Sequence, residues 1–164
     1  MTTRIKMEGV YASLLHSPYV ITAAGERVPT ASFQHKDLAL YFSAHWCRPC
    51  QEFTPRLAEY YTRTNAAMQV VFVSLDRTVK EYDAYRKTMP WPALPFDPET
   101  ASELSESARV AGIPCLAVFN PAGVLKIANA RNMVMQALAA AATNGGAGAG
   151  ASAGAGAGAG TNQP

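Results

Sequence analysis

Two continuous apolar runs separated by one helix-length segment constrain the fold of this chain most strongly. Residues 38–44 (LALYFSA) and 70–74 (VVFVS) have the composition of strands buried on both faces, because apolar and polar side chains do not alternate in them. Between them, residues 49–65 repeat large apolar side chains at helical spacing, beginning with Phe53 and Leu57. A strand, a helix and a second strand in this order predict a βαβ unit.

The remaining segments extend this unit into a mixed sheet. Further helices are predicted over residues 78–87, 100–109 and 133–142, and further strands over residues 19–22, 27–28, 115–119 and 124–127. Short turns containing Gly or Pro join the neighbouring strands into antiparallel hairpins. The sequence therefore predicts an α/β fold with a central mixed β-sheet, helices on both faces and a small N-terminal hairpin.

Polar and aromatic residues between these elements are expected to have structural roles. Asp76 or Thr78 is predicted to cap the helix at 78–87, and Asn132 is predicted to cap the last helix. Asp97 lacks a second acid at a useful spacing, so capping is expected there as well. Trp91 either lines the rim of a substrate site or anchors its loop, and the anchor is the expected role.

The length of 164 residues indicates one packed domain, residues 1–143, followed by a Gly/Ala-rich tail at residues 144–164. The tail carries no charge and no large apolar side chain. It is therefore predicted to be flexible, with silk-like stacking as the alternative.

The composition, with 49% apolar and 16% charged residues and a net charge of +2, excludes a largely disordered chain. Basic residues are scattered among acidic ones, so no nucleic-acid partner is expected. No segment has the pattern of a signal peptide or a membrane span. We expect a cytoplasmic monomer that does not contact membranes.

Two of the three cysteines form a WCRPC motif where the first long strand meets its helix. Unpaired amides and the positive end of the helix dipole favour an anion there, so Cys47 is expected to act as a nucleophilic thiolate. Cys50, one helical turn later, can bond to Cys47 and resolve a mixed disulfide. Pro49 stiffens the loop within the first turn, and Trp46 can shield the pair from water.

A CxxC pair can also hold zinc or remain as two inert core thiols. A zinc site would need further ligands, and only Cys115 and three histidines remain, without a second CxxC or an HxxxH spacing. Redox chemistry without a metal or a bound cofactor is therefore the preferred interpretation.

The Ile113-Pro114 bond precedes the predicted strand at residues 115–119. In the cis form it would turn the chain and expose backbone groups to a bound substrate. The alternative is a trans proline that starts the strand, and spacing alone does not distinguish the two.

Several segments together resemble one family. They are YFSAHWCRPCQEFTPRLAEYY, VVFVSLD, YDAYRKTMPWPALPFD, VAGIPCLAVFNPAG and Arg131, and they occur in the same order as in tryparedoxins and nucleoredoxins of the thioredoxin superfamily. The resemblance implies a thioredoxin fold in which Cys47 is the nucleophile and Cys50 the resolving thiol. It also implies that Trp46 covers the disulfide and that Pro114 is a cis-proline.

The family's activity implies a thiol-disulfide oxidoreductase that serves peroxide detoxification and redox homeostasis. Electrons would come from a small thiol such as trypanothione or a glutathione-like compound. They would pass to disulfide-bearing proteins such as peroxiredoxins. A non-catalytic thioredoxin-like module that binds proteins is the alternative.

The chain departs from the tryparedoxin pattern near the predicted site. Arg48 replaces a proline and His45 replaces a small serine, and both changes should favour the thiolate and make the disulfide more oxidising. A solvated surface charge is an equally good interpretation of Arg48. Tyr41 occupies the position of the buried carboxylate of thioredoxins proper, so the proton of Cys50 needs another route.

Cys115 follows the predicted cis-proline, where the family usually has threonine. It is either a third redox thiol or a small buried hydrophobe, and the second role is preferred. The family's acidic and aromatic ending is replaced after Arg131 by Ala and Gly.

Overall fold

The computed structural model describes residues 9–145. Their contacts divide the chain into two units that meet between Arg131 and Asn132, and each is described by itself. Residues 146–164 lie outside the described residues, so the flexible tail and its silk-like alternative stay predictions.

The first unit is built on a sheet of four strands in the order β4-β3-β5-β6. These strands are β3 (Leu38–Ser43), β4 (Gln69–Ser74), β5 (Cys115–Phe119) and β6 (Leu125–Ile127). β3 is parallel to β4 and antiparallel to β5, and β5 is antiparallel to β6. The predicted mixed sheet is therefore confirmed, and β3 and β4 are the two parallel strands of the predicted βαβ unit.

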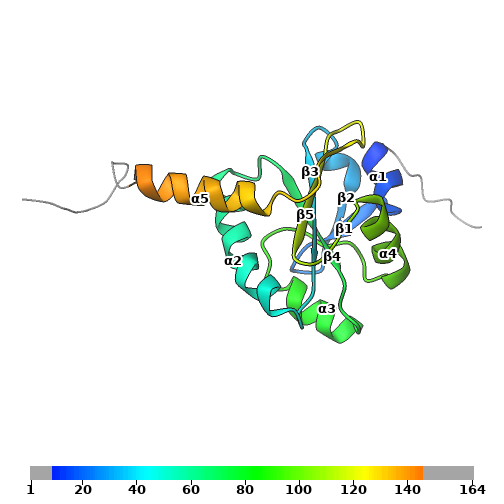
Figure 1. Ribbon diagram of the computed structural model, residues 1–164. Coiled ribbons are helices and arrows are strands. Elements are labelled where there is room, and N and C mark those ends of the chain that lie inside the picture. The colour runs from blue at the N-terminus through cyan, green and yellow to red at the C-terminus, as the bar shows by residue number, and fades with distance from the viewer. Residues whose placement is uncertain (1–8, 146–164) are drawn as a thin grey trace, which may run out of the picture. The chain divides into compact units, whose positions relative to one another are not determined.

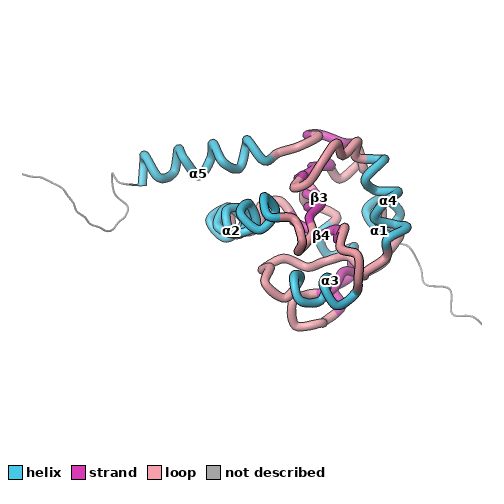
Figure 2. The backbone as a smooth tube through the Cα atoms, turned by 60° about the horizontal axis from the view of Figure 1, so that its bottom comes forward, coloured by secondary structure: helices cyan, strands magenta, loops and turns pink. Residues whose placement is uncertain are grey.

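Helices cover both faces of this sheet, as Figures 1 and 2 show. They are α1 (Val10–Leu15), α2 (Arg48–Arg63), α3 (Val79–Arg86) and α4 (Pro98–Ser107). Side chains of α1 and α4 pack on Leu40 and Phe42 of β3 in one buried cluster. On the other face, the Tyr41 ring meets Phe53 of α2 with ring centroids 5.9 Å apart. Alternation along β3 thus assigns each side chain to one helical layer.

A small hairpin of β1 (Tyr19–Ile21) and β2 (Arg27–Pro29) is confirmed near the N-terminus. The segment after Trp91 links it to β4, because Ala93 exchanges two backbone hydrogen bonds with Ile21, of 2.7 and 2.8 Å. Trp91 itself is 1% exposed. Its ring packs edge-on against Tyr41 and Tyr61, which confirms the anchor role.

Two of the predicted caps are confirmed and two are wrong. Thr78 forms a capping box with Glu81 at the start of α3, and Asp97 accepts two backbone hydrogen bonds at the start of α4. Asp76 caps no helix. Asn132 is not the cap of α5 (Arg131–Gly145), because the helix already begins at Arg131, whose N–H is bound by the side chain of Asn129 at 3.2 Å.

The sequence analysis also missed α1 and the 3-10 helix η1 (Thr30–Phe33). Both are about one turn long, and so short a segment gives little periodicity. Among the described residues, none of the helices has both the length and the apolar character that a membrane span requires.

Candidate active site

The two cysteines of the WCRPC motif lie at the N-terminus of α2, directly beyond the end of β3. Cys47 is the N-cap residue, and its Sγ accepts the backbone N–H of Cys50 at 3.3 Å. Pro49 stands within the first turn, where its missing N–H leaves no hydrogen bond unmade. The start of the helix thus holds one sulfur atom against the backbone of the other cysteine.

The two thiols differ in accessibility. Cys50 is fully buried, whereas Cys47 is 7% exposed, and Ala44, Leu75 and Ile113 pack against them. Burial, assisted by a hydrogen bond with Cys47, raises the pKa of the Cys50 thiol to about 11. Cys50 is therefore protonated near neutral pH, and Cys47 is the thiol that a substrate can reach first.

The loop before β5 approaches the same sulfur atom. The Ile113-Pro114 peptide bond is cis, so the trans alternative is wrong. The Cys47 thiol lies 4.0 Å from the carbonyl oxygen of Ile113. Arg131 donates from Nη1 to the carbonyl of Pro114 at 3.3 Å. The loop with the cis-proline therefore lies next to the candidate nucleophile, and the Arg131 guanidinium binds the carbonyl of that proline.

Asp76 fixes the segment that carries the motif, a role that the sequence analysis missed. Its Oδ1 accepts the backbone N–H of His45 at 2.7 Å, and its Oδ2 accepts the hydroxyl of Ser74 at 2.6 Å. The side chain of Gln51 donates to the carbonyl of His45 from the other side. Asp76 is only 5% exposed, so these bonds form in a dry environment. The position of Asp76, two residues beyond a buried strand, was the sequence feature that could have indicated this role.

Replacing Asp76 with Ala is expected to lower the free energy of unfolding by about 2 kcal/mol, because the N–H of His45 and the buried hydroxyl of Ser74 both lose their acceptor. Urea denaturation measures this change. The control is Glu103→Ala on the exposed side of α4, expected to change stability by less than about 0.5 kcal/mol. Equal values for the two variants would contradict the role given to Asp76.

A chain of buried hydroxyl groups lies beneath Cys50. Tyr41 and Thr54 are joined at 2.7 Å, Thr54 and Tyr85 at 2.7 Å, and Tyr85 and Ser43 at 2.8 Å. Thr54 also donates to the carbonyl of Cys50 at 2.8 Å. Burial raises the pKa of Tyr41 and of Tyr85, so both phenols stay neutral. These hydroxyls hold the first turn of α2 without placing a charge beside the buried thiol.

The raised pKa of Cys50 predicts a pH dependence. With Cys47→Ser and Cys115→Ala, alkylation of Cys50 should accelerate about tenfold per pH unit and level only above the ordinary thiol pKa, because the thiolate is the reactive form and burial, the largest cause of the raised pKa, remains in this variant. A plateau near the ordinary thiol pKa of about 8.5 would contradict the effect of burial.

The same raised pKa makes the stability of the reduced protein depend on pH. Since folding raises the pKa of Cys50, its contribution to the free energy of unfolding is fully present below about pH 8.5 and is lost as the pH rises through about 11.

Three of the predicted residues are exposed beside the cysteines. Trp46 is 45% exposed, and its Nε1 donates to the carbonyl of Leu75 at 3.3 Å. The guanidinium of Arg77 lies over the Trp46 ring at 4.8 Å from its centroid, a contact that the sequence analysis missed. Arg48 extends into solvent, and the exposed His45 ring stands 5.6 Å from the ring of Tyr85.

Cys115 belongs to a different environment. It pairs with Phe42 across the sheet and joins the buried cluster under α1 and α4. Its thiol donates to the carbonyl of Ala128 at 3.4 Å, and burial raises its pKa. These contacts favour the small buried hydrophobe over a third redox thiol.

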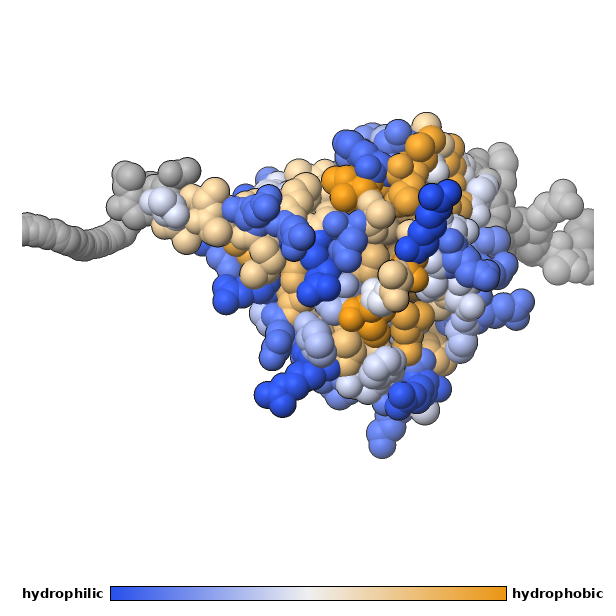
Figure 3. All heavy atoms as spheres, in the orientation of Figure 1, coloured by the Kyte–Doolittle hydropathy of each residue, from blue (hydrophilic) through white to orange (hydrophobic). Residues whose placement is uncertain are grey.

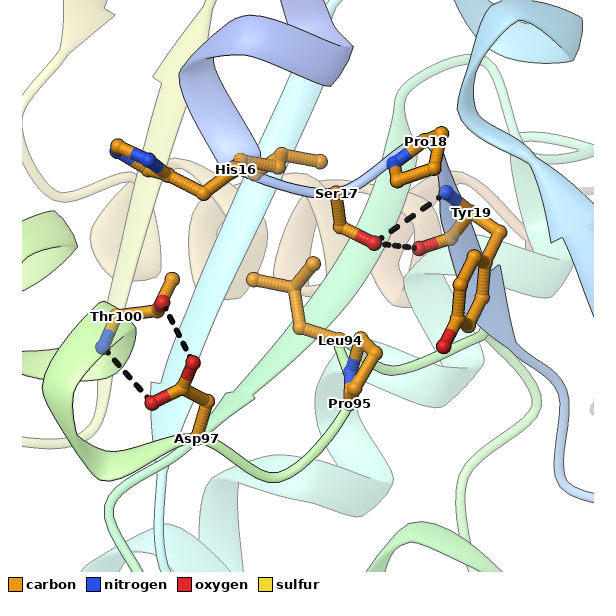
Figure 4. Close-up of a pocket in the computed structure, with 9 residues that line it drawn as sticks. His16, Ser17, Pro18, Tyr19, Leu94, Pro95, Asp97 and Thr100 are labelled. Carbon is orange, nitrogen blue, oxygen red and sulfur yellow. Dashed lines mark hydrogen bonds between the residues drawn. The ribbon is translucent and has the colours of Figure 1, made fainter. Parts of the chain in front are cut away.

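A cavity of about 200 Å³ lies elsewhere, between the end of α1 and the loop before α4. Figure 4 shows Ser17 bonded to the backbone of Tyr19 and Asp97 bonded to Thr100, so these polar groups already have partners. None of the predicted site residues lines this cavity. Within residues 9–145, no three His, Cys, Asp or Glu side chains lie together as a metal site requires.

Comparisons with known proteins agree with this geometry. A family model described as thioredoxin-like matches residues 35–125. A probable nucleoredoxin 1 of Arabidopsis thaliana is 42% identical over 121 residues, which are 71% of this chain and 21% of that protein. Tryparedoxin of Trypanosoma brucei brucei is 40% identical over 117 residues, which are 70% of this chain and 81% of that protein.

One solved structure, tryparedoxin II complexed with glutathionylspermidine, has a TM-score of 0.71 and 31% identity to this chain. The match covers 76% of this chain and 89% of the other. The chain spans only about a fifth of the length of the plant nucleoredoxin.

Proposed function

Because this chain belongs to the thioredoxin-like family that includes tryparedoxins and nucleoredoxins, we propose that it is a thiol-disulfide oxidoreductase that uses Cys47 and Cys50. The fold is the thioredoxin fold. One observation carries the proposal: Sγ of Cys47 accepts the N–H of Cys50 at the start of α2, and the thiol of Cys50, three residues later, is buried. That arrangement suits a dithiol that closes into a disulfide.

The reaction has two exchange steps. The Cys47 thiolate attacks one sulfur of a substrate disulfide, forms a mixed disulfide and releases the other sulfur as a thiolate, which takes up a proton. Cys50 then loses its proton and attacks Sγ of Cys47, and the second substrate sulfur leaves and is protonated. The substrate gains two electrons and two protons, and the protein is left with a Cys47–Cys50 disulfide.

The surrounding residues assist these steps in the proposal. The exposed Trp46 shields the mixed disulfide, and the carbonyl groups at Ile113 and the cis-Pro114 receive the substrate backbone. The helix N-terminus and Arg48 place positive charge beside Cys47, and His45 lies two residues before it. Pro49 keeps the first turn rigid.

The proposed partners are a small thiol donor and disulfide-bearing acceptor proteins such as peroxiredoxins, in the cytoplasm. Support for the donor comes from the solved tryparedoxin II, which is complexed with glutathionylspermidine. A trypanothione-type dithiol or a glutathione-like thiol would therefore restore the reduced state. No bound cofactor takes part in this proposal.

A donor comparison tests the function. The oxidised protein is incubated with trypanothione, with glutathione or with a thioredoxin reductase system, and free thiols are counted by alkylation over time. Reduction by at least one of these donors, followed by transfer of electrons to insulin, is expected. Failure of all three donors would contradict a role as a dithiol carrier.

A further inference from the structure

Two arginines from separate elements lie beside Trp46 and Cys47. Arg77 precedes α3, and its guanidinium is stacked over the Trp46 ring at 4.8 Å from the centroid. Arg48 is the first residue of α2, directly after Cys47, and its side chain is 91% exposed. We call these two side chains the arginine pair.

Both guanidinium groups are available to a partner. Arg48 meets Glu52 only at 3.9 Å, and with both side chains largely exposed such a contact holds the groups weakly. Within residues 9–145, the side chain of Arg77 forms no ion pair. A cation held over a ring by such a contact still has N–H groups that can donate to a carboxylate.

The acidic groups near the arginine pair are already engaged. Asp76 is 5% exposed and accepts from His45 and Ser74. Glu81 accepts the backbone N–H groups of Arg77 and Thr78 in the capping box of α3. Among residues 9–145, the two side chains of the arginine pair therefore have a single ion-pair contact, the weak one between Arg48 and Glu52. Figure 3 shows hydrophilic side chains projecting beside apolar areas on one face of the protein.

We propose that the arginine pair selects protein substrates whose disulfide is flanked by acidic residues. An extended substrate segment advances about 3.3 Å per residue, so residues on the two sides of its cysteine lie on the two sides of Cys47. Carboxylates at these positions pair with Arg48 and with Arg77, and the exposed indole of Trp46 supports the segment between them. This inference rests on the proposed function and adds a substrate class to it.

Two disulfide-bridged peptides of equal length test the selection. They differ only in having Glu or Lys on both sides of each cysteine, and kcat/KM is measured for each with the full chain. The wild type is expected to prefer the Glu peptide about tenfold at low salt, and the preference should shrink at high salt. In the Arg48→Gln/Arg77→Gln variant the ratio should fall to about two or less.

The ratio of the kcat/KM values for the two peptides is independent of any effect of Arg48 on the reactivity of Cys47, because that effect changes both values equally. The matched control is Arg56→Gln, an exposed arginine farther along α2, which should keep the wild-type ratio. Equal rates for the two peptides in the wild type would overturn the inference, as would an equal loss of preference in the control.

A neutral substrate distinguishes a failure of this inference from a failure of the proposed function. Hydroxyethyl disulfide carries no charge, so its reduction reports the dithiol alone. If it is reduced while the peptides show no charge preference, the arginine pair has no selective role and the proposed function stands. If neither it nor a peptide is reduced, the proposed function itself fails.

Discussion

Replacing Cys47 with Ser is expected to lower the rate of insulin reduction with dithiothreitol by at least about 1,000-fold. The hydroxyl of serine is not ionised near neutral pH, and it cannot form the mixed disulfide with which the proposed reaction begins. Cys50 cannot replace it, because it is fully buried and burial raises its pKa to about 11. The residual rate is measured against the rate of dithiothreitol alone.

Cys115→Ala is the matched control for this loss. It removes a thiol from the cluster under α1 and α4, so the rate of insulin reduction should stay within about twofold of the wild type. Equal rates for the wild type and Cys47→Ser would contradict the enzyme and favour a non-catalytic binding module. A large loss in the control would instead identify Cys115 as a third redox thiol.

Replacing Cys50 with Ser is expected to trap the substrate covalently on Cys47. The first exchange still occurs, because Cys47 keeps its place as the N-cap of α2, but no thiol remains to resolve the mixed disulfide. The adduct should be visible on a gel without reductant, and turnover should fall by at least about 100-fold. Some turnover persists because dithiothreitol can release the adduct slowly.

The trapped species needs its own control. The double variant Cys47→Ser/Cys50→Ser should form no adduct, since the attacking sulfur is missing. Absence of any adduct in Cys50→Ser, with an oxidised substrate present in excess, would contradict the resolving role. An adduct that persists in the double variant would place the reactive sulfur at Cys115.

Much of the fold could be predicted because the sequence of each central strand is itself typical of a buried strand. Residues 38–44 and 70–74 are almost entirely apolar, and the structure places strands there with bounds that differ by one residue. The turn at residues 120–123 likewise joins β5 and β6 as expected. The short helix α1 and the start of α4 at Pro98 were missed. Helix α1 is stabilised by contacts with the rest of the chain, such as the packing of Tyr11 and Leu15 in the buried cluster. Its own sequence shows only a weak helical periodicity.

The candidate site was predicted unevenly. The positions of Cys47, Cys50 and Pro49 follow from a motif that spans five residues, so local sequence suffices. The contacts of Asp76 with His45 and of Arg77 with Trp46 each join residues about 31 positions apart, and no local pattern encodes them. The loop geometry at the cis-proline could be narrowed to two alternatives only, because an X-Pro bond in either form fits the same spacing.

Mass spectrometry of the purified chain after mild oxidation tests the redox role of the two cysteines most directly. The account predicts that the protein loses the mass of two hydrogen atoms and that digestion with trypsin yields one fragment with an internal Cys47–Cys50 disulfide, with Cys115 still open to alkylation after unfolding. Three alkylatable thiols after oxidation, or a bond from Cys115 to either partner, would contradict it.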